Sequence, residues 1–354
     1  MSKFLSGKYQ NLKPYVPGEQ PKERKYIKLN TNESPFPPSK FAQSLVAEEL
    51  SRSMLYPDPD NTLLTTAVAD MLGVEKEQVL LTNGSDEILN FAFMAYCDKQ
   101  SKAVFPDISY GFYKVFAEIN NVPYKEIPLK EDFTVDVNDY IKESGTVFIA
   151  NPNAPTGINL PLEEIEKLVS SNPDRIVVVD EAYVDFGGES AVKLIGKYDN
   201  LLVTQTFSKS RSMAGARLGF GVGSKAVISD LNSIKYSTNP YNVNRLTAAA
   251  GLAAVKDVEY FNDNCKEIIK NREYTEEELK KLGFTITNSK TNFLFIKHDA
   301  ISGEDLYQKL KENGVLVRHF TLDRICDYNR VTIGSKEEMQ TFIQTVKDIM
   351  EKLK

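Results

Sequence analysis

Short, continuously apolar segments alternate with helical segments through the middle of the chain. These segments are rich in valine, isoleucine and leucine, and helical patterns separate several of them. Continuous apolar strands of this kind are typical of a parallel sheet that is covered on both faces. We therefore expect an α/β domain here. The expected strands are residues 78–81, 102–105, 146–150, 175–180, 201–204 and 218–222, and the helices between them are residues 87–97, 162–171 and 225–234.

The flanking segments predict a three-part organisation. Residues 1–40 contain scattered prolines and read as an arm that packs on a small domain or on a partner chain. Residues 41–245 form the large domain, which begins with helices at 41–52 and 61–72. Residues 246–354 form a smaller α+β domain. It includes most of a helical pattern at 244–282, which links the two lobes and has Gly251 and Lys256-Asp257 as its candidate breaks.

The composition narrows the classes of partner. The 354 residues carry 43 Lys and Arg against 49 Asp and Glu, a net charge of −6. We expect no nucleic-acid partner, because phosphate binding requires clustered basic residues. We expect no membrane partner, because no segment approaches the roughly 20 apolar residues of a membrane span. The three scattered cysteines and the polar N-terminal segment favour a cytoplasmic protein.

The histidine content limits the possible chemistry. His298 and His319 are the only two histidines in the sequence, so few histidines are available to form a zinc site or a Ser-His-Asp triad. We expect no metal site. Any acid–base catalysis must then rest on lysine, tyrosine, carboxylates or a cofactor.

Two polar segments follow predicted strands and could receive a ligand. Asn83-Gly84-Ser85-Asp86-Glu87 opens a helix, and the free N–H groups of a helix N-terminus bind phosphate. Ser-Asp is also an ordinary helix cap, so this segment alone does not specify a phosphate site. The second segment, residues 151–157 (NPNAPTG), has the composition of a tight turn.

Two further segments carry reactive side chains. Asp180 ends a strand of β-branched residues, where ligands bind in parallel sheets, and Tyr183 follows it. Lys209 lies just after another expected strand, between Ser208 and Ser210, and Arg217 follows eight residues later. A lysine here could lie at the surface, or it could form a Schiff base while Ser208 and Arg217 bind a phosphate.

In this order, the four segments resemble those of the aspartate-aminotransferase-like (fold type I) family of pyridoxal-phosphate enzymes. The resemblance implies a mainly parallel, seven-stranded type of sheet between helices in the large domain. It implies pyridoxal 5'-phosphate as cofactor, with Lys209 as the Schiff-base lysine and proton carrier. Asp180 would pair with the pyridinium nitrogen, and Tyr183 would donate a hydrogen bond to the phenolate oxygen.

The same resemblance assigns the remaining cofactor contacts. Tyr110 would stack on the ring. The phosphate would be held by Ser208, by Arg217 and by the backbone of Ser85 and Asp86. Tyr56 would reach the phosphate of a neighbouring chain, which implies a homodimer with shared active sites. One position departs from the pattern: the family's asparagine before Pro-Thr-Gly is Ala154 here, and Asn153 is the nearest replacement for that cofactor contact.

Within this family, segments at both ends are similar to those of the histidinol-phosphate aminotransferases. The N-terminal loop at residues 29–35 contains Asn32, expected to bind substrate, and Tyr15 lies upstream, expected to close the pocket from the neighbouring chain. Arg330 would bind the α-carboxylate of glutamate and help to hold the phosphate of histidinol phosphate, while Arg318 would bind the distal anion. The implied reaction is transamination between L-histidinol phosphate and 2-oxoglutarate.

Other functions remain open at this stage. A threonine-phosphate decarboxylase and an aromatic amino-acid aminotransferase share the same fold and cofactor. A cofactor-binding regulator would carry a DNA-binding module ahead of the large domain, where this chain has only its short arm.

Overall fold

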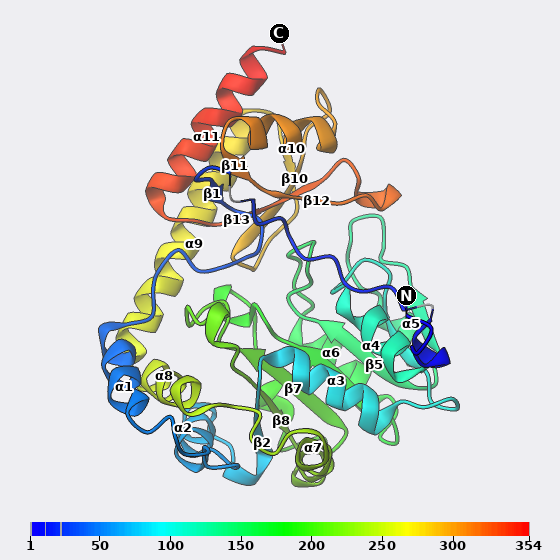
Figure 1. Ribbon diagram of the computed structural model, residues 1–354. Coiled ribbons are helices and arrows are strands. Elements are labelled where there is room, and N and C mark those ends of the chain that lie inside the picture. Colours follow the sequence, from blue (N-terminus) through cyan, green and yellow to red (C-terminus); the bar gives the residue numbers. More distant parts are fainter. Residues whose placement is uncertain (1, 11, 22, 354) are drawn as a thin grey trace.

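The computed structural model describes residues 2–10, 12–21 and 23–353. A large sheet with helices on both faces forms one body, and a smaller body with its own antiparallel sheet lies beside it (Figure 1). The long helix α9 (Val258–Lys281) runs from one body to the other. None of the described helices combines the length and apolar character that a membrane crossing requires.

The large sheet confirms the expected mainly parallel arrangement. Its seven strands lie in the order β2-β8-β7-β6-β5-β3-β4. Strand β8 is antiparallel to both of its neighbours, and the other pairs are parallel. The strands are β2 (Val79–Thr82), β3 (Ala103–Pro106), β4 (Tyr124–Ile127), β5 (Thr146–Ala150), β6 (Val177–Asp180), β7 (Leu201–Thr206) and β8 (Gly219–Gly223).

Alternate residues of the central strands pack into two separate hydrophobic cores. In β6, Val177 and Val179 belong to one core and Val178 belongs to the other, because successive side chains of a strand point to opposite faces. The first core is covered by α2 (Thr62–Leu72), α5 (Val137–Ile141), α6 (Leu162–Ser170) and α8 (Arg245–Lys256). The second core is covered by α3 (Ser85–Tyr96), α4 (Phe112–Asn120) and α7 (Lys225–Thr238). Helix α1 (Lys40–Leu50) packs against α8.

The helical pattern at residues 244–282 consists of two helices, α8 and α9, and not of one. The break lies at Asp257, whose backbone angles (φ −86°, ψ 63°) are not helical. Lys256-Asp257 was one of the two candidate breaks. Gly251 lies inside α8, where the Leu218 side chain lies so close that a Cβ atom on Gly251 would come within 2.4 Å of it. Gly251 therefore permits close packing and does not end the helix.

Strand β4 has no counterpart among the strands expected from the sequence. It lies at the edge of the sheet beside β3, and its first two residues, Tyr124 and Lys125, are exposed. Because these two residues are exposed, β4 lacks the continuous apolar run that marks the central strands.

The smaller body is built around a four-stranded antiparallel sheet with the order β12-β13-β10-β9. The N-terminal segment joins it through β1 (Ile27–Lys28), which pairs in parallel with β11 (Val315–Leu316). The other strands are β9 (Thr285–Ile286), β10 (Phe293–Lys297), β12 (Arg318–His319) and β13 (Asn329–Thr332), and the helices are α10 (Gly303–Glu312) and α11 (Lys336–Glu351).

Candidate active site

A cavity of about 160 Å³ opens at the carboxyl edge of the large sheet. Ala150, Asp180 and Thr206 line it, and these are the last residues of the adjacent strands β5, β6 and β7. Parallel pairing brings the strand ends together at one edge, which is where ligands bind in such sheets. The cavity brings together eight predicted residues: Ser85, Asp86, Tyr110, Asp180, Tyr183, Ser208, Lys209 and Arg217.

Asp180 supplies a buried carboxylate with one free oxygen. Its Oδ2 accepts a hydrogen bond from the Tyr113 hydroxyl at 3.2 Å, while its Oδ1 is buried and has no partner among the described residues. Burial and the nearby Asp86 carboxylate raise the pKa of Asp180 to about 7. A buried, unpartnered carboxylate oxygen is costly unless a donor arrives, so Asp180 fits the cationic N–H group of a pyridinium ring.

The opposite end of the cavity fits a phosphate group. Gly84 precedes α3 with φ +81°, and a Cβ atom on it would come within 2.6 Å of the Arg217 guanidinium. The Arg217 side chain donates to Ser208 Oγ and to Asp86 Oδ2, both at 3.1 Å. The N-terminus of α3, one hydroxyl and one guanidinium therefore converge on one place.

Lys209 also lines the cavity, close to Tyr183. Its Nζ donates to the carbonyl of Thr31 at 3.3 Å and lies 5.8 Å from the centre of the Tyr183 ring. Asn32 donates from Nδ2 to the Tyr183 hydroxyl at 2.9 Å. The structure therefore places Asn32 against Tyr183, at the wall of the cavity.

Two arginines lie side by side on neighbouring strands near Tyr183. Arg318 of β12 and Arg330 of β13 are direct partners in the strand register. Arg330 packs against the rings of Phe293 and Phe320, and burial lowers its pKa. Within the described part of the chain, neither arginine forms a salt bridge with a carboxylate, and Arg330 Nε has no hydrogen-bond partner. The pair is therefore suited to bind an anion from outside the chain.

Tyr15 lies against α4 of its own chain, and its closing of a neighbouring chain's pocket stays a prediction. Its ring lies 4.3 Å from the ring of Phe112, between ring centres. Arg318 donates to the backbone carbonyls of Val16 and Pro17, both at 3.4 Å, and these contacts hold the arm across the site.

Asn153 does not replace the missing asparagine at the cavity wall. Its amide is engaged by Ser109, by Thr156 and by the carbonyl of Ile108, at 2.8–3.0 Å. Ala154 lines the cavity instead. Pro152 and Ala154 line the cavity, whereas the side chains of Asn151 and Asn153 donate to the carbonyls of Leu160 and Ile108.

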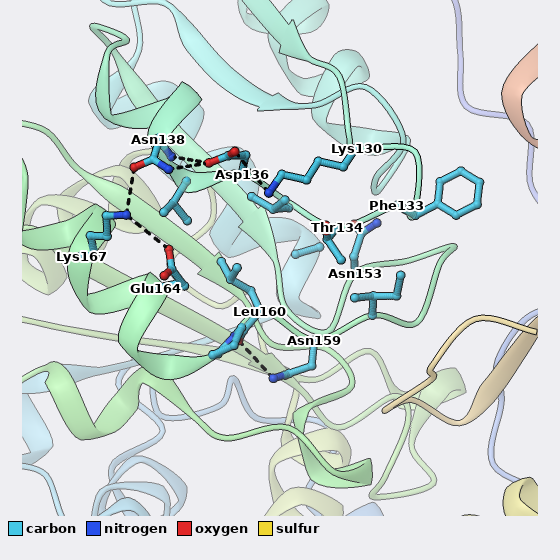
Figure 2. Close-up of a pocket in the computed structure, with 15 residues that line it drawn as sticks. Lys130, Phe133, Thr134, Asp136, Asn138, Asn153, Asn159, Leu160, Glu164 and Lys167 are labelled. Carbon is cyan, nitrogen blue, oxygen red and sulfur yellow. Dashed lines mark hydrogen bonds and ion pairs between the residues drawn. The ribbon is translucent and has the colours of Figure 1, made fainter.

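Asn153 lines a second cavity of about 310 Å³ behind this turn (Figure 2). The charged side chains of this second cavity are paired with one another. Lys130 contacts Asp136 at 3.2 Å, and Lys167 contacts Glu164 at 3.8 Å. Because these charges are already neutralised, the cavity at the strand ends is the stronger candidate for the active site.

Tyr56 lies outside the cavity of its own chain. It is 78% exposed, and its ring stacks on Tyr241 with 4.6 Å between centres. This position is compatible with a contact to another chain, which the single chain does not test.

Sequence reasoning missed two residues that hold the site together. Tyr113 donates to Asp180 and packs edge-on against Tyr110, with 5.7 Å between ring centres. Tyr110 lies just before α4 and Tyr113 lies in its first turn, so the short spacing between two tyrosines is the signal that could have found it. Thr332 bonds to Asn32 across 300 residues of sequence, which no local pattern could reveal.

The raised pKa of Asp180 predicts a pH-dependent stability in the cofactor-free protein. Between its ordinary pKa of 3.8 and about 7, the folded protein retains a proton that the unfolded chain releases. The free energy of unfolding should therefore fall as the pH rises through this range, by up to about 1.4 kcal/mol per pH unit for this group. Asp180→Asn should remove this contribution, as measured by urea unfolding between pH 4.5 and pH 7.

The control for this comparison is Glu181. Burial also raises the pKa of Glu181 to about 7, but this residue is unchanged in the variant, so its contribution cancels between the two proteins. Parallel stability curves for the two proteins would contradict the prediction.

Comparisons with known proteins agree with this geometry. The family model described as aminotransferase class I and II matches residues 24–346. A histidinol-phosphate aminotransferase of Brachyspira hyodysenteriae is 50% identical over 99% of this chain and 100% of its own length. One from Clostridium botulinum is 48% identical over the full length of both chains. The crystal structure of histidinol-phosphate aminotransferase from Sinorhizobium meliloti in complex with pyridoxal-5'-phosphate has a TM-score of 0.90 and 21% identity, covering 100% of this chain and 99% of that one. From its matching family model and its full-length relatives, the chain belongs to the class I and II aminotransferases.

Proposed function

We propose that this protein is a pyridoxal-phosphate-dependent histidinol-phosphate aminotransferase. It exchanges an amino group between L-histidinol phosphate and 2-oxoglutarate, giving imidazole-acetol phosphate and glutamate. The names of the full-length relatives support the substrate. The observation that carries the proposal is the pair Arg318 and Arg330, two neighbouring arginines without a carboxylate partner among the described residues, next to the cavity that holds Lys209.

The cavity residues supply binding and orientation for the cofactor. When bound, pyridoxal phosphate supplies an aldehyde that receives the amino group and a ring that accepts electrons from the substrate's Cα. Asp180 Oδ1 would hold the ring nitrogen, and Arg217 and Ser208 would hold the phosphate. The Tyr183 hydroxyl would donate to the phenolate oxygen, and Tyr110 would lie against the ring. Lys209 Nζ would take the proton from the substrate's Cα and deliver it to C4′ of the cofactor.

The arginine pair explains how one site serves two different substrates. A guanidinium binds a carboxylate and a phosphate with the same planar pair of N–H groups. Arg330 would bind the α-carboxylate of glutamate in one half-reaction and help to hold the phosphate of histidinol phosphate in the other. Arg318 would bind the distal anion, and binding would compete with its contacts to the Val16 and Pro17 carbonyls. Tyr15, at the end of that same arm segment, would close over the bound substrate.

We further propose a cytoplasmic homodimer in which Tyr56 completes the phosphate site of the other chain. Exposed apolar side chains surround Tyr56, including Met54 and Leu55. A groove lined by Val46, Ala216 and Arg217 adjoins the cofactor cavity, since Arg217 lines both. A second copy seated on this face would bring its own Tyr56 toward Arg217. The three free cysteines support a reducing compartment.

The substrate assignment predicts a selective half-reaction. The pyridoxal form of the protein is mixed separately with histidinol phosphate, phenylalanine and threonine phosphate, and conversion to the pyridoxamine form is followed by absorbance. Histidinol phosphate should react fastest, as the names of the full-length relatives indicate, and phenylalanine has no phosphate to present to Arg318 and Arg330. Arg330→Ala should slow the reactions with both histidinol phosphate and glutamate. Faster conversion with phenylalanine would instead assign an aromatic aminotransferase, and release of CO₂ from threonine phosphate would assign a decarboxylase.

The shared site predicts complementation between two defective chains. Tyr56→Phe should weaken pyridoxal-phosphate binding by roughly 10- to 100-fold, the effect of losing one hydrogen bond to a charged group. Lys209→Ala should abolish turnover. Mixed and re-associated, the two variants form hybrid dimers in which one site has both native residues, so tight binding and activity should return to part of the population. If mixing restores nothing although hybrid dimers are detected, Tyr56 does not act across the interface.

A further inference from the structure

Asn32 and Thr332 form a closed pair of hydrogen bonds between the N-terminal loop and the smaller body. The Asn32 backbone N–H donates to Thr332 Oγ1 at 2.9 Å, and the Thr332 hydroxyl donates to Asn32 Oδ1 at 3.0 Å. Both residues are buried, 1% and 2% exposed. Asn32 has φ +56°, a left-handed conformation that asparagine tolerates better than most residues. The Asn292 side chain also donates to the Asn32 carbonyl at 3.0 Å, so this loop is held from two sides.

This pair determines which end of the Asn32 amide faces Tyr183. Because Oδ1 accepts from Thr332, Nδ2 points at the Tyr183 hydroxyl, 2.9 Å away. In the opposite orientation, Thr332 Oγ1 would face two N–H groups and its own hydrogen would lose this acceptor inside the protein. Burying an unmade hydrogen bond is costly, so the network selects the first orientation.

The direction of the Tyr183 hydroxyl follows from this orientation. Its oxygen accepts from Asn32, and a phenol has one hydrogen to donate. That hydrogen cannot return to the Asn32 nitrogen and is left for the cavity that Tyr183 lines. The edge of the Phe293 ring, 5.1 Å away between centres, fixes the Tyr183 ring.

We propose that Thr332 is a positioning residue: by fixing the Asn32 amide, it directs the Tyr183 hydroxyl hydrogen toward the phenolate oxygen of the cofactor. The inference rests on the role of Tyr183 in the proposed function. Thr332 does not touch the cofactor and acts through Asn32 and Tyr183. A residue of the smaller body thereby affects the site at the edge of the large sheet.

The test is the pH at which the absorbance of the bound cofactor changes as its Schiff base with Lys209 loses a proton. A hydrogen bond to the phenolate stabilises its charge, and without that bond the phenolate holds the imine proton more tightly. Tyr183→Phe should therefore raise the midpoint by roughly one to two pH units. Thr332→Val, which removes the hydroxyl at nearly constant shape, should raise it in the same direction by about half as much. Thr332→Ser, which keeps the hydroxyl, should restore the native midpoint.

Two comparisons separate this inference from the proposed function. In the Tyr183→Phe background, Thr332→Val should add no shift, because no hydroxyl is left to direct. The charged residues around this hydroxyl, Lys209, Arg330 and Asp180, are the same in every variant. If Tyr183→Phe leaves the midpoint unchanged, the proposed role of Tyr183 fails. If Tyr183→Phe raises it and Thr332→Val does not, the role of Tyr183 stands and the inference about Thr332 is overturned.

A second variant covers the case in which Thr332→Val does not fold. Asn32→Asp keeps the shape of the side chain, but its carboxylate accepts hydrogen bonds and would take the Tyr183 hydrogen. It should raise the midpoint more in the native background than in the Tyr183→Phe background, where only its added charge acts. Equal shifts in the two backgrounds would overturn the inference.

Discussion

The parallel pairing of β5, β6 and β7 is the constraint on which the active site depends. It aligns Ala150, Asp180 and the residues after Thr206 at one edge, so that a carboxylate, a lysine and a proline-rich turn meet around one cavity. The same sheet buries Asp180 with one oxygen that has no partner among the described residues. In the proposed function, a cationic ring nitrogen would offset the cost of that burial, which would couple the stability of the core to the cofactor.

Residues of the smaller body and of the N-terminal segment complete the candidate site at the edge of the large sheet. Strand β13 carries both Arg330 and Thr332, so one short strand holds the residues that we propose for anion binding and for the orientation of Tyr183. The N-terminal segment is attached by β1 and crosses from the smaller body toward α4 (Figure 1). In the proposed function, substrate binding and cofactor tuning would therefore depend on the position of the same strand.

Local sequence patterns predicted the central strands and most cavity residues, because fully buried parallel strands leave continuous apolar runs and their polar residues follow at the ends. The resemblance to a known family supplied the roles. Edge strand β4 was not predicted, because Tyr124 and Lys125 are exposed and interrupt the apolar pattern. Asn153 does not line the cavity because its amide is bonded to Ser109, Ile108 and Thr156, and such contacts cannot be predicted from the composition of the turn. Thr332 and the in-chain position of Tyr15 depend on contacts between segments far apart in sequence.

We propose that pyridoxal phosphate attaches to Lys209. Borohydride reduction of the holoprotein would make that bond permanent, and mass spectrometry of its peptides would then locate it. A pyridoxyl group should be found on Lys209 and should be absent from the Lys209→Ala variant. A pyridoxyl group on a different lysine in the native protein, or none, would show that Lys209 is not the attachment site.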